Sequence, residues 1–275
     1  MSNFLDRKKS KDKQANWIFF ALGVLVILSV IYFSYKIMTF IKLSEEDGCP
    51  EIDGARGTTV ILFDNTDKYE PVIEADIKAH LFKIKDSVKK YQKLAIYIIT
   101  DDAKNIKPQI EICNPGSMAD KSKFAFLNSN PKKIKDRWEK KFSKEVDKIL
   151  NDLLVGGTSE WSPIFEMIQA VNISSFKHSN ENFRNENKLY IFSDFIHNTP
   201  EFSQYKDKSD FKTFKKNNLN YYEKIYSMLR GTFVQLYVVN RRQSESIESM
   251  NNFWVDFLVA TKAKNRVPYI EYMGK

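Results

Sequence analysis

The sequence predicts an α/β fold: a doubly wound, mostly parallel central sheet with helices on both faces, preceded by one transmembrane helix. Short β-branched runs alternate with amphipathic segments of helical length, which is typical of parallel strands joined by helices. A long apolar run precedes them. The 275 residues suffice for one large domain or two small ones.

Residues 17–41 form the apolar run, interrupted by a single charged residue, Lys36. A helix needs roughly 20 mostly apolar residues to cross a bilayer, so this run is long enough to span with some tilt. A cleaved signal peptide is the alternative. Its apolar core has about 7–15 residues and precedes a small-residue cleavage site, which is absent here. We therefore expect an uncleaved span.

The distribution of basic residues predicts the orientation of this span, because Lys and Arg accumulate on the cytoplasmic side. Five basic residues lie in residues 1–16, whereas only Lys36 and Lys42 lie at the far end. We expect a cytoplasmic basic tail (1–16), a single-pass helix (17–41), a stem (42–55) and an extracytoplasmic, periplasmic domain (56–275) on an inner or plasma membrane.

The net charge of +8 does not indicate a nucleic-acid partner. Residues 1–42 carry seven Lys and Arg against two Asp, so most of the basic excess belongs to the membrane-flanking segment. Two cysteines, Cys49 and Cys113, both fall on the predicted extracytoplasmic side, where a disulfide is permitted. Two unpaired cysteines are equally compatible with the sequence.

The first half of the domain alternates strand and helix signals. Residues 56–63 are a β-branched run bounded by Gly57, typical of a buried strand. Pro71 begins a helix whose apolar residues recur every three or four positions. Residues 94–100 predict the next strand, and residues 109–112 alternate as a short edge strand does.

A long amphipathic helix follows the loop at 117–130, with an apolar stripe from Ile134 to Leu153. Gly156 and Gly157 are expected to end it. The next helix is expected to begin with Ser162 as its N-cap and Pro163 at its first position. Residues 174–187 are rich in Asn and Ser and are expected to form a solvated loop.

The C-terminal half repeats the alternation. We expect, in order, a strand, a loop, a helix, a strand, a helix and a last strand, at residues 188–193, 194–208, 211–229, 232–239, 247–261 and 269–273.

Four oxygen-bearing side chains lie just past expected strand or helix ends. Asp64 and Thr66 follow the first strand, Thr158 follows the long helix, and Asp194 follows the strand at 188–193. Ligands of open α/β sheets bind where the carboxyl ends of strands converge. Carboxylate and hydroxyl oxygens suit a hard divalent cation, so we expect Mg²⁺ or Mn²⁺ there. Each residue alone could instead cap a turn.

The order of these motifs resembles the von Willebrand factor A domain over residues 56–273. That family has a doubly wound α/β domain with a metal-ion-dependent adhesion site. Its first loop carries Asp-x-Ser-x-Ser, its second a Thr and its third an Asp. The resemblance implies metal ligation by Asp64 and Thr66 in the first loop, Thr158 in the second and Asp194 in the third.

Lys68 departs from the family pattern, which has a hydroxyl residue at that position. A charged ammonium has no lone pair for a metal. Either Lys68 turns outward and leaves a weakened metal site, or its charge replaces the metal and pairs with Asp64 and Asp194.

Catalytic alternatives find less support in the sequence. Aspartyl-phosphatase chemistry needs a carboxylate two residues after the first Asp, and Thr66 occupies that place. The three histidines, His80, His178 and His197, share no metal-ligand spacing. His197, three residues past Asp194, is expected at the surface.

The sequence therefore predicts a non-enzymatic, membrane-anchored interaction module whose metal captures an acidic side chain of a protein partner. Two alternatives stay open. One is a metal-dependent phosphoester hydrolase that uses the same carboxylates, and the other is a structural component of a bacterial envelope assembly with a vestigial site.

Overall fold

The computed structural model describes residues 17, 19–35, 41–65, 69–101, 106–117, 131–155, 157, 159–177, 180–239 and 247–274. The chain divides into two compact units, Met1–Lys42 and Leu43–Lys275. The residues expected to form the stem, from Leu43 onward, thus belong to the same unit as the α/β domain.

In the first unit, Trp17 and residues 19–35 are helical. Large apolar side chains on this helix are exposed, among them Trp17 at 73% and Phe19 at 72%. Residues 18 and 36–40 of the expected span lie outside the described residues. No helix within the described ranges combines the length and the apolar character needed to cross a membrane.

The second unit is built on a six-stranded sheet of order β3-β2-β1-β4-β5-β6. Neighbouring strands pair in parallel except β2 and β3, which are antiparallel. The mixed α/β class and the mostly parallel sheet are therefore confirmed. The strands are β1 (Thr58–Asp64), β2 (Lys93–Ile99), β3 (Ile110–Cys113), β4 (Lys188–Ser193), β5 (Phe233–Val239) and β6 (Tyr269–Met273).

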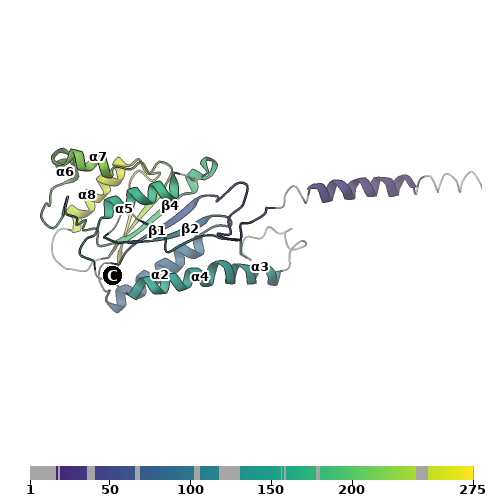
Figure 1. The fold of residues 1–275 in the computed structure, drawn as a ribbon, viewed down its shortest axis with the longest axis horizontal. Coiled ribbons are helices and arrows are strands. Elements are labelled where there is room, and N and C mark those ends of the chain that lie inside the picture. The colour runs from purple at the N-terminus through teal and green to yellow at the C-terminus, as the bar shows by residue number, and fades with distance from the viewer. Residues whose placement is uncertain are drawn as a thin grey trace, which may run out of the picture. The chain divides into compact units, whose positions relative to one another are not determined.

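Helices cover both faces of the sheet (Figure 1). One face of the sheet packs against α2 (Pro71–Ser87) and α4 (Lys144–Asp152). The other face packs against α5 (Ile164–Val171), α6 (Phe211–Asn217), α7 (Leu219–Ile225) and α8 (Ile247–Ala260). The alternation along β1 shows the two layers, because Val60 and Leu62 join the core under α5–α8 whereas Ile61 and Phe63 join the core under α2 and α4.

The expected long helix is continuous but not uniformly α-helical. It runs as α3 (Pro131–Trp138), a π-helical segment (Glu139–Ser143), α4 and a 3-10 turn (Leu153–Val155). Beyond the π-helical segment, Leu150 is fully buried and Ile149 only partly so. The π segment widens the helix locally. It also places Ser143 3.1 Å from Lys85 Nζ, which pairs with Asp147 at 2.7 Å.

Two other expectations were wrong in detail. The predicted loop at 174–187 contains a π-helical turn (Asn172–Phe176) and a 3-10 helix (Glu181–Glu186). The predicted helix at 211–229 is broken at Asn218, whose backbone leaves the helical region with φ −120° and ψ 42°. The Asn218 side chain donates to the Phe214 carbonyl, which is how Asn competes with helix continuation.

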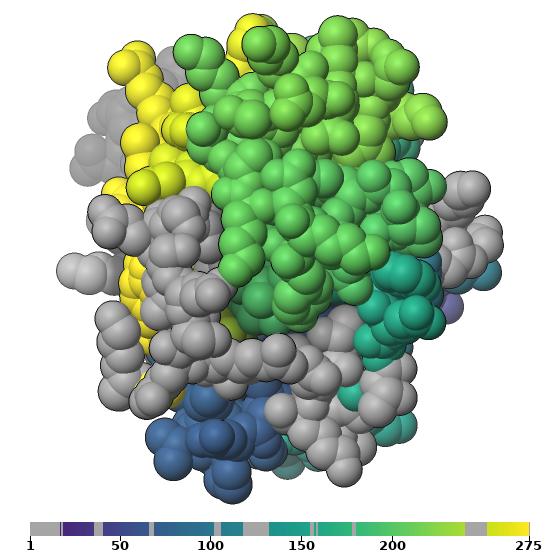
Figure 2. Space-filling view, turned by 90° about the vertical axis from the view of Figure 1, so that its left-hand side faces the viewer, coloured from purple at the N-terminus to yellow at the C-terminus, as the bar shows by residue number. Residues whose placement is uncertain are grey.

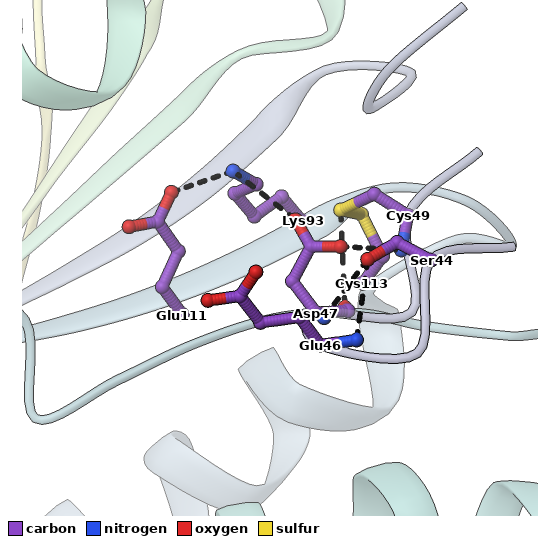
Figure 3. Close-up of a disulfide and its surroundings, with 7 residues drawn as sticks. All are labelled: Ser44, Glu46, Asp47, Cys49, Lys93, Glu111 and Cys113. Atoms are coloured by element: carbon purple, nitrogen blue, oxygen red, sulfur yellow. Dashed lines mark hydrogen bonds and ion pairs between the residues drawn. A yellow bond between two sulfur atoms is a disulfide. The ribbon is translucent and has the colours of Figure 1, made fainter. Parts of the chain in front are cut away.

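A disulfide joins Cys49 to Cys113 on the edge strand β3, which settles the question that the sequence left open. Figure 3 shows the turn that carries Cys49 lying against this edge. The Ser44 hydroxyl accepts from Glu46 N, and Asp47 Oδ1 accepts from Cys49 N at 3.1 Å. The Asp47 carbonyl accepts from Cys113 N, so the turn also satisfies the backbone of an edge strand.

Removing this bridge should destabilise the domain. The disulfide closes a sequence separation of 64 residues, for which the chain-entropy argument gives about 4 kcal/mol. We expect the Cys49→Ser/Cys113→Ser double variant of the full chain to unfold at a lower urea concentration, with a free energy of unfolding reduced by an amount near this value. Reduced wild-type protein is the matched control. Equal unfolding midpoints for oxidised protein and variant would contradict the prediction.

Candidate functional site

The candidate site lies at the carboxyl ends of β1 and β4. The strand order reverses there, because β1 has β2 on one side and β4 on the other. Open α/β sheets bind their ligands at such a reversal. The register pairs Phe63 with Phe192. The next residues of the two strands, Asp64 and Ser193, therefore lie side by side, with Asp194 immediately beyond. Figure 2 looks onto the left-hand side of Figure 1, where the segment after β4 (green) covers the upper part.

Asp64 is fully buried, with 0% exposure. Its Oδ2 accepts hydrogen bonds from Ser193 Oγ at 2.8 Å and from Ser162 Oγ at 3.1 Å. A buried carboxylate is costly unless donors or cations compensate it. One oxygen of Asp64 thus links three chain segments: the end of β1, the segment before α5 and the end of β4.

The first and second loops also meet through the backbone. Gly157 N donates to the Asn65 carbonyl at 2.9 Å. A Cβ on Gly157 would approach that carbonyl oxygen to 2.8 Å, so only glycine permits this contact. The amide oxygen of Asn65 is buried without a hydrogen-bond partner among the described residues, which leaves an unsatisfied acceptor at this point.

Asp101, which follows β2, orders the second loop. Its Oδ1 accepts from the Ser159 hydroxyl and from Trp161 N at 3.2 Å. The Trp161 carbonyl lies 2.7 Å from the same hydroxyl oxygen. The segment is also joined to the third loop, because Ser162 and Asn198 exchange backbone hydrogen bonds at 2.9 and 3.0 Å.

The third loop begins with a tight turn. Asp194 is partly exposed, and its Oδ1 accepts from Ile196 N at 3.0 Å. Phe195 has φ 59°, a left-handed conformation that is strained for an aromatic residue. Ser193 Oγ accepts from Phe195 N, and Trp254 Nε1 donates to the Phe195 carbonyl at 2.7 Å. These bonds hold the strained turn that presents Asp194.

The structure thus places two of the four expected ligands, Asp64 and Asp194, at the ends of adjacent strands. Thr66 and Thr158 lie outside the described residues, as does Lys68. Within the part of the chain that the structure describes, no three His, Cys, Asp or Glu side chains gather as a metal-binding group. The four expected ligands include only two residues of these types, Asp64 and Asp194, so they would not form such a group of three.

The described residues fit a hard divalent cation in their chemistry. They offer carboxylates, hydroxyls and the unsatisfied amide oxygen of Asn65, all oxygen donors of the kind that Mg²⁺ and Mn²⁺ take.

The roles of Ser162 and Ser193 were missed from the sequence. Ser162 is not the N-cap of α5, because Pro163 occupies that position and no side-chain cap forms. Its hydroxyl instead donates to Asp64. A signal for Ser193 was present: along β4, Leu189 and Ile191 face the α5 side, so strand alternation places Ser193 on the same face as Asp64.

His197 is fully buried, contrary to the expected surface position. Its ring stacks on Phe165 with centroids 4.2 Å apart. Burial lowers the pKa of His197 to about 3, so the ring is neutral at physiological pH. Because Nδ1 accepts from Phe165 N, Nε2 carries the proton and bonds to the Tyr221 hydroxyl at 2.9 Å.

The sequence matches no family model and no curated protein. Among solved structures, the chain is similar to proximal thread matrix protein 1 from the mussel byssus, with a TM-score of 0.43 and 12% sequence identity. The alignment covers 80% of this chain and 44% of that one, so the chain spans less than half of that protein's length.

Removing the hydroxyl of Ser162 or of Ser193 should destabilise the fold. Ser193→Ala or Ser162→Ala takes one donor from a buried carboxylate, and a hydrogen bond to a charged group contributes about 1.5–3 kcal/mol. Denaturant unfolding of the full chain should show losses in this range. Ser203→Ala is the matched control, since its buried hydroxyl has no partner among the described residues. Equal effects of Ser193→Ala and Ser203→Ala would contradict the assigned role.

Proposed function

We propose that this chain is a single-pass, membrane-anchored interaction protein with a doubly wound, von Willebrand factor A-like domain. In this proposal, a divalent cation held by Asp64, Thr66, Thr158 and Asp194 binds an acidic side chain of a protein partner. The domain then works outside the cytoplasm, and the basic residues 1–16 stay inside.

The meeting of three loops at one carboxylate is the observation that carries the proposal. Asp64 at the end of β1 is bonded to Ser162 before α5 and to Ser193 at the end of β4. These loops converge at the reversal of the strand order, where open α/β sheets bind their ligands. Asp194 lies next to Ser193 and is partly exposed, as a residue shared with a partner must be.

A divalent cation explains why the partner group should be acidic. Mg²⁺ and Mn²⁺ prefer oxygen ligands and keep several waters, and an anionic oxygen from a partner can replace one of them. The partner therefore supplies Asp or Glu. Ser162 and Ser193 hold one oxygen of Asp64 at the place where the three loops meet.

Lys68 leaves two versions of the site. In one, the ammonium turns away and a weakened cation site remains. In the other, the ammonium pairs with the two carboxylates and the metal is absent. Metal binding by the wild type and by Lys68→Ser separates them. In the first version the wild type already binds the cation and the variant binds it more tightly, whereas in the second only the variant binds it.

Two observations support the membrane-anchored, extracytoplasmic arrangement. The Cys49–Cys113 disulfide is typical of a protein that folds in an oxidising compartment. The helix of residues 19–35 exposes apolar side chains along its length, among them Leu25 at 64% and Ile31 at 59%, which would favour lipid over water.

The Asp194→Asn variant should lose the partner and the metal response but keep its fold. Asparagine retains the oxygen that accepts from Ile196 N while removing the charge. We expect in-cell cross-linking of the tagged full chain to lose its partner adduct. Mg²⁺ or Mn²⁺ should raise the unfolding temperature of the wild type but not of Asp194→Asn, because a ligand of the folded state stabilises it.

Asp207→Asn is the matched control for this experiment. Asp207 lies in the same loop, and its Oδ1 accepts from Ser209 N at 2.9 Å in the same kind of turn. It should behave as the wild type in both assays. Retention of the adduct by Asp194→Asn, or its equal loss in Asp207→Asn, would count against the proposal.

The orientation can be measured independently. An epitope tag placed after Lys275 should be digested by protease added to right-side-out membrane vesicles, whereas a tag before Met1 should be protected. Inverted vesicles should show the opposite pattern, since the same bilayer is then presented from its other side. Protection of the C-terminal tag in right-side-out vesicles would refute the extracytoplasmic placement.

A further inference from the structure

A groove of about 550 Å³ lies between α5 and α7, separate from the site at Asp64. Its volume falls within the range of roughly 300–1,000 Å³ that is usual for ligand sites. Aliphatic side chains form much of the wall, among them Ile106, Ala170, Ile173 and Ile225. Ile173 is 49% exposed, so apolar surface is open to solvent here.

Glu166 supplies a carboxylate to this groove from α5. Its Oε1 accepts from the Tyr221 hydroxyl at 2.6 Å, and Tyr221 is itself bonded to His197 Nε2 at 2.9 Å. This chain from a fully buried histidine holds the Glu166 side chain in place. Glu166 is therefore a pre-positioned group of the kind that specific sites use.

Among the described residues, no Lys or Arg forms an ion pair with the Glu166 carboxylate. Its Oε2 is buried with no hydrogen-bond donor among the described residues. The nearest ring nitrogen, His197 Nδ1, is 3.9 Å away and belongs to a neutral imidazole. Burial raises the pKa of Glu166, and the charge of Glu201, which also lines the groove, raises it further. A bound cation would relieve both effects.

We propose that the groove between α5 and α7 binds a lysine side chain of a partner protein, with its ammonium at Glu166 and Glu201. The four methylenes of lysine would lie along Ile173 and Ile225, while the charged head lies between the carboxylates of Glu166 and Glu201. This site goes beyond the proposed metal-dependent contact and does not require it.

Lys224 is the one cationic side chain in the described lining of the groove. It is exposed, and two carboxylates face this single ammonium, so the lining has an excess of negative charge. Lys224 should weaken the binding of a second ammonium by repulsion. Its removal is therefore expected to strengthen binding, which distinguishes electrostatic recognition from apolar recognition.

The test uses the full chain in non-ionic detergent with isoleucine δ1-methyl ¹³C labels, and two capped tripeptides, acetyl-Gly-Lys-Gly-amide and its norleucine analogue. The lysine peptide should shift the Ile173 and Ile225 resonances, and the norleucine peptide should not. Glu166→Gln should weaken binding at least tenfold, and Lys224→Gln should tighten it severalfold. Chelation by EDTA should change nothing, since the site is independent of the metal.

Glu223→Gln is the matched control: it makes the same charge change on α7, at an exposed residue outside the groove. It should bind as the wild type does. If Glu166→Gln does not fold, Glu201→Gln replaces it and should weaken binding at least threefold. Equal shifts from the norleucine peptide, or unchanged binding in both glutamate variants, would overturn the proposal.

Discussion

The buried carboxylate of Asp64 constrains how the loops are arranged at the carboxyl ends of the strands. A charge at the end of the central strand β1 cannot be left without compensation. The chain satisfies it with hydroxyls from the segment before α5 and from the end of β4. Three loops that are distant in sequence are thereby fixed around one oxygen, and the close contact at Gly157 adds a backbone bond between two of them.

The same edge shows how a strained segment is maintained. Phe195 adopts a left-handed backbone conformation directly after Asp194. Its carbonyl is held by the indole of Trp254 from α8, and its amide by Ser193. Packing of α8 on the sheet therefore also positions Asp194. A substitution that shifts Trp254 would move the turn that carries Asp194 at the candidate site.

Much of the fold followed from local patterns. β4 was predicted at its observed bounds because a short apolar and aromatic run, Leu189 to Phe192, is followed by the polar residues Ser193 and Asp194. The edge strand β3 was expected from its alternation, which reflects one covered face. By contrast, the π-helical segment at Glu139–Ser143 and the break at Asn218 were not expected. Ser143 in the π segment contacts Lys85 of α2, a residue distant in sequence, whereas Asn218 bonds locally to the Phe214 carbonyl, which apolar periodicity does not reveal.

The sequence by itself determined the α/β class, the order of strands and helices along the chain, and the position of Asp64 and Asp194 at strand ends. These features follow from hydrophobic periodicity, which is local. Only the tertiary structure decided that Cys49 bonds to Cys113 and that His197 is buried beside Tyr221. It also decided that the Ser162 hydroxyl donates to Asp64 instead of capping α5. Each of these depends on distances between residues far apart in the chain, which periodicity does not encode.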